Sequence, residues 1–153
     1  MRAIAWLGFA LGLSAAGAPP VDTGDAKAIQ GTWMVDRATF DGIPEKDVPP
    51  DLVKETTAMR FTFRSDEMTI KHPPGPPPFE KGRKEKSAYR LDPSKNPKQI
   101  DLSDSARGIY ELKGDTLKLC WDIRGKKNGR PTKFGFDKDK ATVVYYVLKR
   151  EKK

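Results

Sequence analysis

The chain has 153 residues, a length typical of one domain with a single core. Its formal net charge is +8, but lysines and arginines alternate with acids through most of the sequence and are not gathered in one helix or arm. This distribution favours a solvated surface and argues against a nucleic-acid-binding protein. A single cysteine, Cys120, excludes an internal disulfide, so stability must come from the core.

The N-terminus has the features of a secretory signal peptide. Arg2 gives a short basic start, an apolar run extends from Ile4 to Leu13, and small residues follow from Ser14 to Ala18. The run is too short to span a bilayer stably, which weighs against an uncleaved anchor. We expect residues 1–16 to be removed, which lowers the net charge to +7, and the mature protein to be periplasmic or secreted, with no transmembrane segment.

We expect the mature chain to contain a linker (17–28), one folded domain (29–150) and a basic tail (151–153). Residues 26–30 are long enough for one helical turn that could plug the end of a barrel. Gly31-Thr32-Trp33 then opens a strand over 32–40, with Trp33 and Val35 on one face and Ala38 and Phe40 on the other. A buried indole removes roughly 200 Å² from water, so Trp33 should organise the core.

The next segment, 43–57, is a long connection with a helical turn at 51–56, and it would lie over the mouth of a barrel. Alternating apolar residues predict strands at 58–64 and 67–72. Prolines between 73 and 78 cannot join a sheet ladder and predict an exposed polyproline II loop, followed by a charged run to Lys86.

Further strands are expected at 87–91, 99–102, 108–112, 116–123, 132–136 and 141–150. Eight or nine short strands separated by turn signals are typical of a sandwich or barrel. We predict an all-β fold, an antiparallel up-and-down barrel of about eight strands with a short N-terminal helical turn. The residues expected to line the interior are Trp33, Phe61, Phe63, Met68, His72, Trp121 and Tyr145.

An ordered set of sequence blocks supports this fold by resemblance. Besides Gly31-Thr32-Trp33, the blocks are Leu91 to Leu102, Gly108 to Leu112, Gly114 to Cys120, Arg130 to Phe134 and Leu148 to Arg150. Together they resemble the lipocalin and wider calycin pattern, and more closely a lipocalin-like domain family of secreted proteins described from planctomycete bacteria. The resemblance covers residues 29–150.

In the calycin pattern the first-strand tryptophan lies at the closed end of the barrel and a C-terminal arginine packs across it. The resemblance therefore implies structural roles for Gly31, Trp33 and Arg150. The planctomycete family has no established activity, so the resemblance implies a fold and a compartment but no reaction.

Candidate chemical groups are few. His72 could serve as an axial haem ligand, but a histidine packed beside the barrel mouth is the simpler interpretation. One histidine excludes a multi-histidine zinc site, so we expect no metal or cofactor. Cys120 would need His72 as its base to act as a nucleophile, and a structural role is favoured. Asp101, Asp104 and Glu111 could pair in space, although surface ion pairs are more usual.

Because no catalytic constellation is visible, we expect a binding protein rather than an enzyme. The first hypothesis is a secreted lipocalin-like binding module whose barrel holds a small apolar or amphipathic ligand. The alternative is a packed barrel that binds a protein or an envelope component through its Pro-rich loop (73–86) and basic loops.

Overall fold

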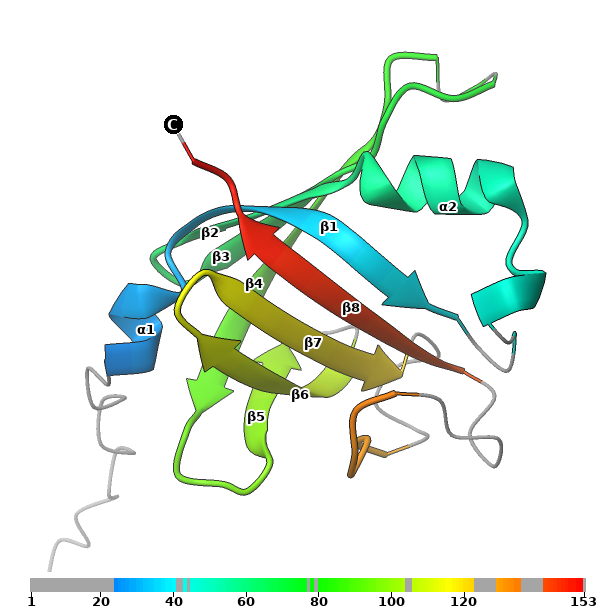
Figure 1. The fold of residues 1–153 in the computed structure, drawn as a ribbon. Helices are drawn as coiled ribbons and strands as arrows, with labels where there is room; N and C mark the ends of the chain where they lie inside the picture. Colours follow the sequence, from blue (N-terminus) through cyan, green and yellow to red (C-terminus); the bar gives the residue numbers. More distant parts are fainter. Residues whose placement is uncertain are drawn as a thin grey trace, which may run out of the picture.

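The computed structural model (Figure 1) describes residues 24–40, 43, 45–76, 78, 80–103, 106–122, 129–135 and 142–152. The helices of this part are α1 (Gly24–Ala28), the 3-10 helix η1 (Glu45–Asp47) and α2 (Pro50–Thr57). Its strands are β1 (Gly31–Thr39), β2 (Arg60–Arg64), β3 (Glu67–Lys71), β4 (Lys84–Asp92), β5 (Lys98–Leu102), β6 (Ala106–Lys113), β7 (Thr116–Asp122) and β8 (Val143–Arg150). The expected signal peptide lies outside the described residues.

The eight strands form a closed barrel. Each strand pairs antiparallel with the next in the chain, and β8 pairs antiparallel with β1. The closing pair places Trp33 opposite Arg150 and Val35 opposite Leu148. The predicted all-β, antiparallel up-and-down barrel with a short N-terminal helix is therefore confirmed. The two α-helices lie at opposite ends of it (Figure 1).

Aromatic rings fill the middle of the barrel. The centre of the Phe61 ring lies 5.2 Å from that of Tyr146 and 6.1 Å from that of Trp121, and the last two are 5.6 Å apart. Phe63 meets Tyr89 edge to face at 5.1 Å. These distances are those of stacked and tilted aromatic pairs in protein cores, so this part of the interior is packed.

A bulge in β1 changes which residues face the core. The register between β1 and β8 shifts between Val35 and Arg37, so that Ala38 lies opposite Tyr146. Two successive residues of β1 then face outward, and Ala38 and Phe40 pack against the core with Val35. The prediction of Ala38 and Phe40 on the opposite face from Trp33 and Val35 was wrong, because simple alternation does not allow for an extra residue.

Two other predicted segments differ. Residues 132–135 form bends instead of the expected strand. The chain there follows Pro131 and contains Gly135 at φ +97°, and Phe134 packs on the outside of the barrel against Tyr145, with ring centres 5.9 Å apart. Strand β4 begins at Lys84, three residues before its expected start, because the charged residues form a ladder with β3. The sequence also predicts turns after the first expected strand, at 41–42, and before the last, at 137–140, and these residues lie outside the described part of the chain.

Arg150 closes the end of the barrel beside α1. Its guanidinium carbon lies 4.2 Å from the centre of the Trp33 ring. Nη1 donates to the carbonyl of Gln30 at 2.8 Å and Nη2 to that of Ala28 at 2.6 Å. A Cβ on Gly31 would lie 3.1 Å from Nη1, and the φ of +117° there favours glycine. Arg150 thus joins β1, β8 and α1 in one contact.

A second contact fixes the other end of α1. Asp25 Oδ2 accepts hydrogen bonds from Lys98 Nζ and from the Tyr110 hydroxyl, each at 2.7 Å. Burial acts to raise the pKa of Asp25, but these hydrogen bonds outweigh it and hold that pKa below its usual value. The helix therefore plugs the barrel as a fixed part of the domain, and it begins at Gly24, within the segment expected to be a linker.

Replacing Arg150 tests this closure. We expect Arg150→Ala to lower the free energy of unfolding by about 2 kcal/mol, because it removes two charged hydrogen bonds and a cation–π contact. Urea denaturation followed by tryptophan fluorescence measures the change. Lys152→Ala, at an exposed position two residues away, is the matched control. Equal stability of the two variants would contradict a closing role for Arg150.

Candidate functional site

A pocket of about 420 Å³ lies at the end of the barrel opposite α1. It is bounded by α2, by the residues that follow β1, and by the start of the Pro-rich loop after β3. The lining residues are Phe40, Leu52, Glu55, Thr56, Met59, His72, Pro73, Pro74, Gly75, Pro76, Arg83 and Tyr146. We call this the mouth pocket.

The inner side of the mouth pocket is apolar. Phe40, Met59 and Tyr146 come from three different segments and all pack against the barrel core. Tyr146 lines the pocket and also contacts Phe61 and Trp121 below it. Tyr146 therefore lies between the mouth pocket and these two rings.

A charged group of three residues lies at one side of the mouth pocket. Glu85 Oε1 is 3.1 Å from Nε2 of His72 and 2.6 Å from Nη2 of Arg83. Arg83 Nη2 is also 3.4 Å from His72 Nε2. Glu85 lies opposite Ile70, a core residue, so its β4 position faces the interior. Inward-facing Glu85 is thus balanced by basic side chains at the rim.

Tyr146 connects the charged group to the aromatic rings. Burial raises the pKa of the Tyr146 hydroxyl to about 12, and the negative charge of Glu85 adds to the effect. The hydroxyl consequently stays protonated at neutral pH. It can donate a hydrogen bond to a ligand in the pocket.

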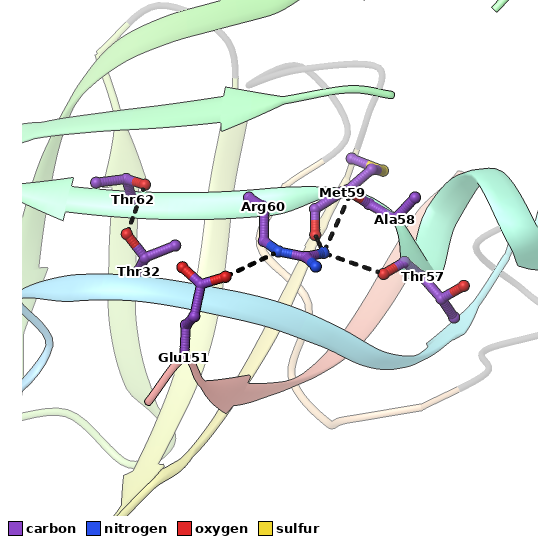
Figure 2. A network of polar contacts seen from close by, with 7 residues as sticks. All are labelled: Thr32, Thr57, Ala58, Met59, Arg60, Thr62 and Glu151. Carbon is purple, nitrogen blue, oxygen red and sulfur yellow. Dashed lines mark hydrogen bonds and ion pairs between the residues drawn. The ribbon is translucent and has the colours of Figure 1, made fainter. Parts of the chain in front are cut away.

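The end of α2 that borders the mouth pocket is held by Arg60 (Figure 2). Arg60 Nη1 donates to the carbonyls of Thr57, Ala58 and Met59 at 3.3, 3.2 and 3.0 Å, and Nε bonds Glu151 at 3.4 Å. A cation at the last carbonyls of a helix satisfies groups that have no partner within the helix. The start of α2 is set by Pro50 at its first turn, where no N–H is needed.

Most of the predicted interior residues lie in the packed core. Exposed fractions are 0% for Trp33, Phe61 and Phe63, 1% for Met68 and 6% for Trp121. These five side chains belong to one hydrophobic cluster. They provide support beneath the mouth pocket but do not line it.

Tyr145 was predicted to face the interior, and the structure corrects this to Tyr146. Tyr145 packs on the outer face with Phe134, Ile109 and Cys120. Strand β8 is apolar on both faces, and Phe134 packs against Tyr145 on its outer side, so sequence alternation could not distinguish the two tyrosines.

His72 lies at the rim of the mouth pocket, directly after β3, with its side chain 24% exposed. Its Nε2 atom is held by Glu85 and Arg83, so that nitrogen does not face the pocket as an unoccupied haem ligand would. Cys120 belongs to the outer cluster, and it is therefore not placed to use His72 as a base.

Two of the three acidic residues considered from sequence, Asp101 and Glu111, have basic partners in the structure. Asp101 pairs with Arg130 at 2.6 Å, and Glu111 pairs with Lys118 at 2.7 Å and with Lys113 at 3.0 Å. The Lys118 and Lys113 hydrogen bonds lower the pKa of Glu111. Asp104 lies outside the described residues. The structure thus gives Asp101 and Glu111 separate cationic partners.

Sequence reasoning missed Arg83, Glu85 and Leu52. A usable signal existed for Glu85, because counting back by twos from Tyr89 along one strand places it on the inward face. The charged run was instead assigned to a loop. Leu52 had no such signal, since its position depends on how α2 packs.

Comparison with known proteins adds no assignment. No protein-family model matches the chain, and no curated protein matches it. None of the helices in the described ranges is long and apolar enough to cross a membrane. Within the same ranges, no three His, Cys, Asp or Glu side chains are grouped so that they could hold a metal ion. The resemblance to the planctomycete lipocalin-like family stays a prediction.

The burial of Cys120 gives a direct test of the outer cluster. Burial raises the pKa of its thiol to about 11, and the residue is 0% exposed. At pH 8 only about 0.1% of such a thiol is thiolate, so Ellman's reagent should react at least about 100-fold faster in urea than in the native protein. Similar rates in the two conditions would contradict the packing described for residues 129–135.

Proposed function

We propose that the protein is a secreted lipocalin-like binding module that takes a small amphipathic ligand in the mouth pocket. The observation that carries this proposal is a pocket with an apolar inner side and the His72, Glu85 and Arg83 group at its rim. Its volume of about 420 Å³ falls in the range of small-molecule sites. The packed rings below place the ligand at the mouth rather than deep in the barrel.

The charges around the pocket favour a polar but uncharged head group. Glu85 and Arg83 offset each other in an ion pair at 2.6 Å, so this part of the rim does not favour a charged head group. The side chains of Arg83 and Glu85 are 50% and 49% exposed, and pairs this exposed contribute at most about 1 kcal/mol. A ligand can therefore replace one of these contacts at small cost. The apolar part of the ligand would lie against Met59 and Tyr146.

The alternative of a packed barrel that acts through its surface draws support from the filled interior. The two functions are compatible, because the mouth pocket and the outer face use different residues. The mouth pocket nevertheless has the shape of a small-molecule site, and we therefore place the ligand there.

The proposal that the protein is secreted rests on its N-terminal sequence. We expect the protein exported by its own host to begin at Gly17, since cleavage after Ala16 follows small residues at the positions that signal peptidase requires. Edman sequencing or intact-mass measurement of protein recovered from the cell envelope and medium tests this. Recovery of the intact chain in the cytoplasm would contradict the proposed location.

Filling the mouth pocket tests the binding function. The probe is N-phenyl-1-naphthylamine, an uncharged amphipathic dye whose fluorescence rises in apolar surroundings. Leu52→Trp places a large ring in the pocket, and we expect it to weaken dye binding by at least about tenfold. Val53→Trp, on the same helix but 45% exposed and outside the pocket, should leave binding unchanged.

Two results would contradict the proposal. One is the absence of any fluorescence rise with the wild-type protein. The other is equal binding by the Leu52 and Val53 variants. If the dye binds as expected, native mass spectrometry of the protein from its own envelope would identify the ligand through an added mass that is lost on denaturation.

A further inference from the structure

Strand β4 pairs with a different neighbour in each half of its length. Residues 89–92 pair with β5 on one side, and residues 84–88 pair with β3 on the other. Among the described residues, no strand pairs with Lys84 to Ser87 on the side away from β3. Strand β5 ends at Leu102, and the next residue, Ser103, still donates its N–H to the Ala88 carbonyl at 2.9 Å.

The ladder with β3 determines which backbone groups face the open side. His72 N–H bonds Arg83 carbonyl and Tyr89 N–H bonds Asp66 carbonyl, at the two ends of this ladder. Hydrogen-bonded and non-bonded pairs alternate in an antiparallel ladder, so Glu85 and Ser87 bond β3. The N–H and C=O groups of Lys84 and Lys86 consequently point to the open side.

An apolar hollow lies along the same edge. A pocket of about 400 Å³ is lined by Met68, Ile70, Leu102, Glu85 and Ser87, together with the edge residues Lys86 and Ser103. Met68, Ile70 and Leu102 belong to the barrel core. A side chain projecting inward from a strand added at this edge would enter the hollow, because alternate residues of a strand face the same side.

The outward side of this edge is basic. Lys71 lies directly opposite Lys84 in the β3–β4 ladder, and like charges at such positions repel. Among the described residues, neither of these two lysines has an ion pair, whereas Lys86 pairs with Glu67 at 2.9 Å. Lysines on an exposed edge also discourage pairing with a second copy of this same basic chain. Acidic residues in a partner strand would relieve the repulsion.

We propose that residues Lys84 to Ser87 of β4 bind an extended acidic segment of another protein by strand addition. Main-chain hydrogen bonds to Lys84 and Lys86 supply the pairing, as in other cases where a peptide extends a sheet. Acidic side chains of the segment lie beside Lys84 and Lys71, and an apolar side chain enters the hollow next to Met68. This surface meets the rim of the mouth pocket at Glu85, but the proposal does not depend on the proposed ligand.

A synthetic peptide of alternating acidic and valine residues, Glu-Val-Asp-Val-Glu with blocked ends and a fluorescein label, is the probe. Fluorescence anisotropy measures its binding to the full chain. Amide hydrogen exchange, followed by NMR, measures the edge directly. We expect rapid exchange at Lys84 and Lys86 in the free protein, slow exchange at Glu85 and Ser87, and slowing at Lys84 and Lys86 when the peptide binds.

Two kinds of variant separate pairing from charge. Lys86→Pro removes an N–H that faces the open side and leaves the ladder with β3 intact, so binding should fall at least about tenfold. Lys86→Gln keeps that N–H and should change binding by only about twofold. The double variant Lys84→Glu, Lys86→Glu should also bind at least about tenfold more weakly, whereas Lys95→Glu, in the exposed β4–β5 turn, should not.

Four results would overturn the proposal. The first two are no binding of the peptide and equal binding by the Lys86→Pro and Lys86→Gln variants. The others are slow exchange at Lys84 and Lys86 in the free monomer, and a dimer in sedimentation experiments that is lost in Lys86→Pro. The last result would assign the edge to a second copy of this chain. Unchanged exchange at Glu85 and Ser87 in each variant shows that the ladder with β3 has formed, so a failure to fold is recognised separately.

Discussion

The packing of Phe61, Trp121 and Tyr146 across the middle of the barrel is the constraint on which the site depends. Three rings with centres 5.2 to 6.1 Å apart fill this part of the interior, and they separate the lower part of the barrel from the mouth pocket, which Tyr146 lines. The lower part is closed by Arg150 and α1. Because the rings cannot move apart without losing buried contacts, a ligand is confined to the residues above them.

The inward face of β4 changes from polar to apolar along the strand, and this change explains where the polar part of the pocket lies. Glu85 and Ser87 face inward near the mouth, while Tyr89 and Leu91 face inward toward the closed end. A carboxylate facing the interior is costly unless basic groups accompany it. His72 and Arg83 supply them, and their location at the two ends of the Pro-rich loop brings them to the same side of the mouth.

The fold could be predicted from the sequence because alternation is strongest where one face of a strand is solvated. Strands β2 and β3 show this, with Phe61, Phe63 and Met68 buried between half-buried or exposed neighbours. Alternation fails where that contrast is absent, as in β8, whose outer face is covered by Phe134, and it does not detect the β1 bulge. The site was harder to predict, because Leu52 and Arg83 reach it through loops whose paths no local pattern determines.

The Pro-rich loop links the mouth pocket to the open edge of β4. Its prolines cannot join a ladder, so the hairpin of β3 and β4 ends in a segment that projects beyond the barrel beside α2 (Figure 1). One side of this hairpin supplies His72 and Arg83 to the pocket. The part of β4 from Lys84 to Ser87 extends past the end of β5, which leaves its backbone without a second strand among the described residues. The same extension that builds the rim of the pocket therefore exposes the edge, and a protein bound there would contact Glu85, which also belongs to the rim.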